Sequence, residues 1–89
     1  MKSTDGGKNV TITFINKTSE SRTAMWVDFK GNPVQYFTLE PGQSYKQQTW
    51  TTHPWFFTDG PGNCIEAMIP SAGKSTYKIK VPSPGFGDE

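Results

Sequence analysis

Short runs of alternating side chains, separated by turn sequences, constrain this chain more than any other feature. Val10, Ile12 and Phe14 occupy every second position, which is the period of a strand with one buried face. No window repeats its apolar residues at the helical period of about 3.6 residues. Sequences rich in Gly, Pro and Asn interrupt the runs at 31–33, 40–42, 59–63 and 70–73. About seven short strands follow, and they predict an all-β fold, an antiparallel β-sandwich.

The 89 residues suffice for one small domain. Residues 1–8 are polar and contain Gly, so we expect a flexible N-terminal tail. We place the β-sandwich domain at residues 9–82 and a disordered C-terminal tail at residues 83–89. The expected strands are 9–15, 24–29, 34–36, 44–49, 55–58, 65–69 and 75–81.

Charge and hydropathy argue against several classes of partner. Nine basic and eight acidic side chains leave a net charge of +1, which favours neither nucleic acid nor an anionic membrane. No apolar run reaches the length of a membrane span, and the first residues lack the apolar core of a signal peptide. The single Cys64 cannot form an internal disulfide and indicates a reducing compartment. We therefore expect a soluble monomer in the cytoplasm or the nucleus.

The residue inventory also argues against metal binding and catalysis. One His and one Cys, without a close carboxylate cluster, do not supply the three or four ligands of a metal site. His53 lies near Thr49, Thr51 and Thr52 in the sequence, but no carboxylate stands at an obvious position to orient it as a general base. We expect no enzyme activity, no catalytic residue and no cofactor.

Aromatic and hydrogen-bonding residues gather in one segment, residues 26–55, which holds all three Trp, the only His and two of the three Tyr. A box of rings with one hydroxyl and one imidazole suits a flat, weakly polar ring that bears a single hydroxyl group. Exposed rings on a β-sandwich also suit sugar stacking, so a carbohydrate-binding module is the alternative, and a purely structural domain is a third. The candidate pocket residues are Trp26, Tyr36, Thr49, His53 and Trp55.

Five sequence elements resemble those of one known family. They are F-I-N-K-T at 14–18, M-W-V-D-F-K-G-N-P-V-Q-Y at 25–36, T-L-E-P-G at 38–42, T-W-T-T-H-P-W-F-F-T-D at 49–59 and M-I-P-S at 68–71. The first four align without a gap from Phe14 to Asp59, and W-x-[ND]-F-x-G with H-x-W-x-F-x-D is a specific combination. On these residues the chain resembles the β-domain family of the von Hippel–Lindau tumour suppressor.

The resemblance implies a seven-stranded sandwich that recognises 4-hydroxyproline in an extended peptide of hypoxia-inducible factor. Trp26 would form the floor of the pocket and Trp55 a wall. Tyr36 would pack on the pyrrolidine ring and hydrogen-bond the peptide backbone. The hydroxyl group of the ligand would be bound by His53 and Thr49.

This sequence departs from the family pattern beside the pocket. Thr49 replaces a Ser, which keeps the hydroxyl and adds a methyl group. Gln48 stands where the family has a His that touches the peptide through its backbone, and Phe37 replaces a Pro. We therefore include Phe37 and Gln48 among the peptide-binding residues and expect an altered preference for the residues that flank hydroxyproline.

The family protein continues into a helical domain that recruits elongins and a cullin to form a ubiquitin ligase. This sequence predicts no helix for binding elongin or cullin. The expected partner is a prolyl-hydroxylated protein, and the resemblance implies a role in oxygen sensing and substrate recognition for ubiquitin-dependent degradation. The chain would be either an excised domain of a longer protein or a stand-alone reader.

Overall fold

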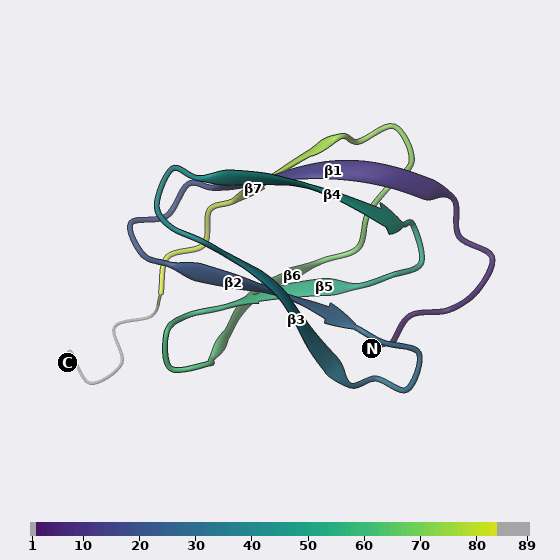
Figure 1. Cartoon of the computed structure of the whole chain (residues 1–89), viewed down its shortest axis with the longest axis horizontal. Helices are drawn as coiled ribbons and strands as arrows, with labels where there is room; N and C mark the ends of the chain where they lie inside the picture. The colour runs from purple at the N-terminus through teal and green to yellow at the C-terminus, as the bar shows by residue number, and fades with distance from the viewer. Residues whose placement is uncertain (1, 84–89) are drawn as a thin grey trace.

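The chain folds into a β-sandwich, which confirms the predicted fold class (Figure 1). The structure, a computed structural model, describes residues 2–83, so most of the expected C-terminal tail lies outside the described residues. This part of the chain contains no helix, and hence none long and apolar enough to cross a membrane. The strands are β1 (Asn9–Asn16), β2 (Arg22–Val27), β3 (Pro33–Leu39), β4 (Ser44–Trp50), β5 (Trp55–Thr58), β6 (Cys64–Met68) and β7 (Thr76–Ile79).

The strands form a three-stranded sheet in the order β4-β1-β7 and a four-stranded sheet in the order β3-β2-β5-β6. The two sheets lie on opposite sides of the molecule in Figure 1. Every strand pair is antiparallel except β1 with β7, which is parallel. β3 and β4 are edge strands of different sheets and are consecutive in the chain, so the connection between them passes from one sheet to the other.

The core is built from large apolar side chains of both sheets. The Phe14 ring from β1 lies 5.5 Å from the Trp55 ring and 5.4 Å from the Phe57 ring of β5, measured between centroids. Full burial of one such side chain contributes about 1.5–3 kcal/mol, which is large beside the net stability of about 5–15 kcal/mol of a typical domain. The buried apolar residues are Ile12, Phe14, Ala24, Val27, Leu39, Trp55, Phe57 and Ile79.

The N-terminal segment differs from the loose tail that its composition suggests. Ser3 is 2% exposed; its hydroxyl donates to the carbonyl of Val27 at 2.5 Å, and its N–H donates to the carbonyl of Asp28 at 3.0 Å. Further along, the N–H of Thr4 donates to the carbonyl of Thr52 at 3.2 Å. A polar composition cannot reveal these contacts because the partners lie more than 20 residues away in the sequence.

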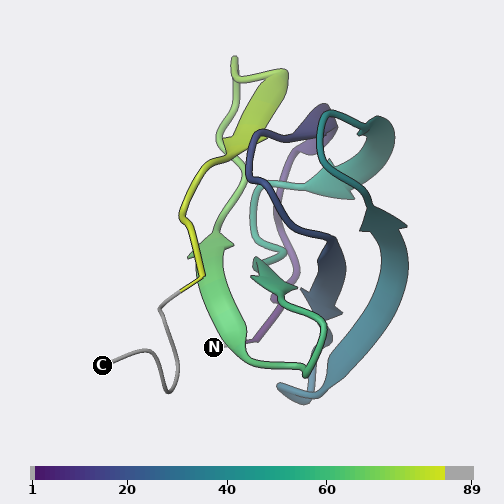
Figure 2. The ribbon, with the colours of Figure 1, turned by 90° about the vertical axis from the view of Figure 1, so that its left-hand side faces the viewer.

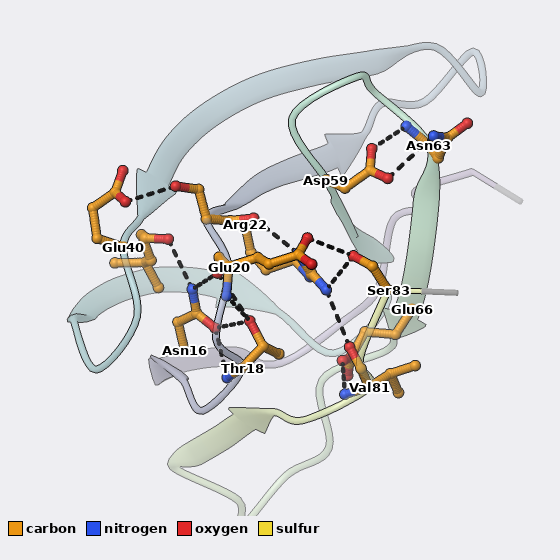
Figure 3. Close-up of polar contacts among 12 residues, drawn as sticks. Asn16, Thr18, Glu20, Arg22, Glu40, Asp59, Asn63, Glu66, Val81 and Ser83 are labelled. Carbon is orange, nitrogen blue, oxygen red and sulfur yellow. Dashed lines mark hydrogen bonds and ion pairs between the residues drawn. The ribbon is translucent and has the colours of Figure 1, made fainter. Parts of the chain in front are cut away.

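A fully buried side chain, Asn16, organises the turn after β1 (Figure 3). Its amide nitrogen donates to the carbonyls of Glu20 and Leu39, at 2.8 and 2.9 Å. Its amide oxygen accepts from the N–H and the hydroxyl of Thr18, at 2.9 and 2.7 Å. All four hydrogen-bonding positions of the amide are therefore filled, as a buried polar group requires.

The segment after β7 runs beside the four-stranded sheet (Figure 2), and two charged side chains of that sheet bind it (Figure 3). One oxygen of Glu66 accepts from the N–H groups of Lys80 and Val81, at 3.1 and 2.8 Å. Arg22, 1% exposed, donates to the carbonyl of Val81 at 3.3 Å and to the hydroxyl of Ser83 at 2.9 Å. β7 therefore ends at Ile79 and not at residue 81, because these N–H groups bind a side chain instead of a neighbouring strand.

Replacing Asn16 tests how much its buried amide contributes to the stability of the domain. Asn16→Ala leaves two backbone carbonyls and the donors of Thr18 without their partner, so the free energy of unfolding should fall by about 2–4 kcal/mol. Asn32→Ala, at an exposed turn position, is the matched control and should change it by less than about 0.5 kcal/mol. Urea unfolding followed by tryptophan fluorescence gives both values, and an equal loss in the two variants would contradict this role for Asn16.

Candidate functional site

Eight residues line a cavity of about 160 Å³ where the edges of the two sheets meet, which we call the aromatic pocket. β2, β3 and β5 of the four-stranded sheet each contribute one ring, and two further rings, Phe29 and His53, lie in loops. β4 of the other sheet contributes the ring of Trp50 together with the polar side chains of Gln48 and Thr49. This volume is below the range of about 300–1,000 Å³ that is usual for drug-sized ligands, so the cavity suits a single small ring. The lining residues are Trp26, Phe29, Tyr36, Gln48, Thr49, Trp50, His53 and Trp55.

Tyr36 reaches the pocket through a β-bulge in β3. β2 and β3 pair Ala24 with Phe37. The next pair is Met25 with Gln35, so Tyr36 is an extra residue without a partner on β2. Bulges of this kind redirect a side chain, and they are frequent next to binding sites. Alternation alone would place Tyr36 and Phe37 on opposite faces of the sheet, whereas both rings here contact Trp55.

The two neighbouring rings of β3 nevertheless have different surroundings. The Tyr36 ring is edge-on to Trp55 at 5.0 Å and to Trp26 at 6.1 Å, and it remains 47% exposed. The Phe37 ring packs 5.8 Å from Phe14 in the core and 4.5 Å from Tyr45. Phe37 therefore does not line the pocket, while the other six residues selected from the sequence do.

A buried hydrogen bond joins Trp55 to Thr49. The indole N–H of Trp55 donates to the Thr49 hydroxyl oxygen at 3.0 Å, and the two residues are 1% and 3% exposed. A hydroxyl has one donor and two acceptor positions. Because Trp55 occupies one acceptor position, the Thr49 O–H is left to donate to another group.

His53 lies among three rings of the same pocket. Its centroid is 5.5 Å from Trp26, 5.3 Å from Phe29 and 6.2 Å from Trp50. Desolvation by burial lowers the pKa of His53 below its ordinary value, and the negative charge of Asp5 opposes this shift by raising it. The lowered pKa favours the neutral imidazole at pH 7, the form that carries one N–H donor and one acceptor nitrogen.

Trp26 and Gln48 complete the polar inventory of the pocket. The indole N–H of Trp26 is buried, and residues 2–83 supply no acceptor for it. A buried donor of this kind is usually satisfied by a ligand or by water. Gln48 is exposed, and its amide donates to the Asn9 side chain at 3.1 Å, so it forms the outer rim of the pocket.

Phe29 and Trp50 line the pocket but were not selected from the sequence. Both also line a second cavity of about 380 Å³, the adjoining groove, which shares these two rings and His53 with the pocket. Phe29 is part of the W-x-[ND]-F-x-G motif, and Trp50 is one of the three Trp of segment 26–55, so the sequence carried a signal for both residues. The other residues of the adjoining groove are Thr4, Asp5, Gly6, Gly7 and Thr52.

The comparison with known families agrees with this geometry. The family model of the VHL beta domain matches residues 1–68, which cover β1 to β6 and every residue of the aromatic pocket. Within residues 2–83 there is no group of three His, Cys, Asp or Glu side chains that could hold a metal ion. The VHL β domain is a substrate-recognition module, which fits a pocket of aromatic and hydrogen-bonding groups. The match covers more than half of the sequence, and the chain therefore belongs to the VHL β-domain family.

Proposed function

We propose that the aromatic pocket binds 4-hydroxyproline within an extended segment of a prolyl-hydroxylated protein. One observation carries this proposal. The buried Thr49 hydroxyl, with one acceptor position filled by Trp55, stands with neutral His53 in a cavity the size of one small ring. A ligand must therefore present both a hydroxyl group and a compact apolar ring.

The donors and acceptors form a consistent chain. The Trp55 N–H donates to Thr49, and the Thr49 O–H donates to the oxygen of the ligand hydroxyl. The ligand hydroxyl then donates to the acceptor nitrogen of His53. Unmodified proline would leave two polar groups without partners, at a cost of about 1–3 kcal/mol each. Sites that bind a ligand hydroxyl in this way reject the analogue without it by factors up to about 10⁴.

The edge strands supply a path for the rest of the peptide. β3 and β4 are edges of their sheets, and each leaves unpaired backbone groups on one side. An extended peptide can pair with such an edge, so that its backbone contributes affinity while the pocket contributes specificity. Tyr36 and Gln48, one on each edge strand, line the pocket between them.

The ring geometry supports this ligand over a carbohydrate. Trp26, Tyr36 and Trp55 surround one concave cavity, and the Tyr36 ring is inclined by 74° to Trp26 and by 77° to Trp55. A sugar-stacking face would present its rings as a coplanar row.

Prolyl hydroxylation depends on oxygen, so the binding of a hydroxylated protein would link recognition to oxygen supply. A link to ubiquitin-dependent degradation would require a partner that recruits the ligase.

Paired peptides that differ only in 4-hydroxylation of one proline test the proposal directly. The hydroxylated peptide should bind at least about 100-fold more tightly, because only its hydroxyl satisfies both Thr49 and His53. Isothermal titration calorimetry measures both affinities. Equal affinity for the two peptides, or no binding of either, would overturn the proposal.

Two substitutions of Thr49 separate its roles. Thr49→Val should reduce the discrimination between the paired peptides by about 5- to 150-fold, because only His53 then loses a partner with unmodified proline. It should also lower the free energy of unfolding by about 1–3 kcal/mol because the Trp55 N–H loses its acceptor. Thr49→Ser keeps the hydroxyl and is the matched control that should retain both properties. Discrimination that is as strong in Thr49→Val as in the wild type, measured at a temperature where the variant is folded, would show that Thr49 does not contact the ligand hydroxyl.

The pH dependence tests the acceptor role of His53. The neutral imidazole accepts the ligand hydroxyl and the imidazolium cannot, so affinity should be constant above the pKa and fall by up to about tenfold per pH unit below it. Burial lowers this pKa, so the loss should begin below the usual range for His. Asp5→Asn removes a charge that raises the pKa and should move the loss to still lower pH. Affinity that stays constant from pH 8 to about pH 4.5, with circular dichroism showing a folded protein, would refute this role.

A further inference from the structure

The adjoining groove is continuous with the aromatic pocket but has a different chemical character. Its volume is about 380 Å³, and Phe29, Trp50 and His53 line both cavities. The opposite wall is the N-terminal segment, residues 4–7. A peptide bound in the pocket therefore passes this groove if it continues along Phe29, Trp50 and His53.

Two large rings of the groove face solvent. The exposed fractions of the Phe29 and Trp50 side chains are 46% and 43%, which is high for large aromatic residues. The faces of aromatic rings carry partial negative charge and attract a cation placed over them. Pairs of such rings are the usual components of sites for ammonium groups.

Asp5 adds a full negative charge to the same groove. It is the only lining residue that is charged at pH 7, and its charge reaches His53, whose pKa it raises against the effect of burial. No lysine or arginine side chain lines this groove. The groove therefore offers one carboxylate and two ring faces, with no positive charge among its lining residues.

The segment that carries Asp5 is fixed on both sides. Before it, the N–H of Thr4 donates to the carbonyl of Thr52, and the Thr52 hydroxyl donates to the carbonyl of Thr4 at 2.5 Å. After it, Gly7 packs directly on Thr52; a Cβ atom at Gly7 would lie 2.5 Å from the Thr52 hydroxyl oxygen. The backbone on both sides of Asp5 is thus held by contacts with Thr52, next to His53 in the chain.

We propose that the adjoining groove is a second subsite, which binds the side chain of a Lys or Arg residue within about three positions of the hydroxyproline. The inference rests on the proposed function of the aromatic pocket. A basic side chain satisfies the carboxylate of Asp5 and stacks on the rings of Phe29 and Trp50. An acidic side chain is repelled by Asp5, and an apolar side chain covers the rings but removes water from the carboxylate without replacing it.

A peptide series measures this preference. Hydroxyproline peptides carry Lys, norleucine or Glu at each of the three positions on either side of the hydroxyproline. At one position or more, the Lys peptide should bind about three- to tenfold more tightly than the norleucine peptide, and the Glu peptide should bind most weakly. The difference between Lys and norleucine should shrink at high salt because the carboxylate is exposed to solvent.

Two variants with the same change in net charge test whether Asp5 causes the preference for Lys over norleucine. Asp5→Asn should bring the Lys-to-norleucine ratio towards one. Glu40→Gln removes a carboxylate from the turn before β4 and should leave the ratio unchanged. A ratio that is unaffected by Asp5→Asn, or that falls equally in both variants, would overturn the assignment of the groove.

The failure of this inference can be told apart from the failure of the proposed function. If hydroxylation controls binding but Lys and norleucine bind equally at every position, only the second subsite is wrong. If hydroxylation has no effect, tetramethylammonium chloride tests the groove alone, with tert-butanol as the neutral control. The cation should shift the ring NMR signals of Phe29 and Trp50 in the wild type and not in Asp5→Asn, and an absence of shifts would overturn the subsite.

Discussion

The hydrogen bond from the Trp55 indole to the Thr49 hydroxyl connects the core of this domain to its surface site. Trp55 belongs to the four-stranded sheet and Thr49 to the three-stranded sheet, so the bond crosses between the layers. The Trp55 ring also packs against Phe14 in the core and against Tyr36 at the pocket. One side chain therefore sets both the contact between the sheets and the orientation of the Thr49 hydroxyl. The buried bond thus fixes the direction of one hydrogen-bonding group in the pocket, which favours selective recognition.

Polar side chains hold the loops and strand ends that the small apolar core does not fix. Asn16 binds the turn after β1 and the end of β3, while Arg22 and Glu66 bind the backbone after β7. Each of these side chains binds backbone groups in a loop or at the end of a strand, which is how a domain with few residues keeps its loops in place. The same device operates at the N-terminus, where Ser3 binds the end of β2. This anchoring matters for function because it holds the N-terminal segment against the loop of His53, where it forms a wall of the adjoining groove.

The prediction from sequence succeeded where local patterns determine the outcome. Alternation in β1 correctly identified Ile12 and Phe14 as buried, and β5 was predicted with its observed limits. β3 was predicted too short, because the bulge at Tyr36 interrupts the alternation on which the prediction depends. The same bulge explains why Phe37 was wrongly selected for the pocket: Tyr36 lines the pocket, while Phe37 packs on Phe14. The antiparallel prediction holds for every pair except β1 with β7, whose pairing follows a return from the other sheet that no local pattern reveals.

The sequence by itself determined the all-β class, the family and six of the eight residues that line the aromatic pocket, because side-chain period, turn chemistry and motif spacing are local properties of the chain. Only the tertiary structure decided which polar groups remain available inside it. The donor role left to Thr49 follows from a bond to Trp55, and the lowered pKa of His53 follows from its burial. The adjoining groove likewise exists only because the N-terminal segment lies beside residues about 45 positions away in the sequence. Such contacts depend on how the sheets and loops pack, which residue spacing does not encode.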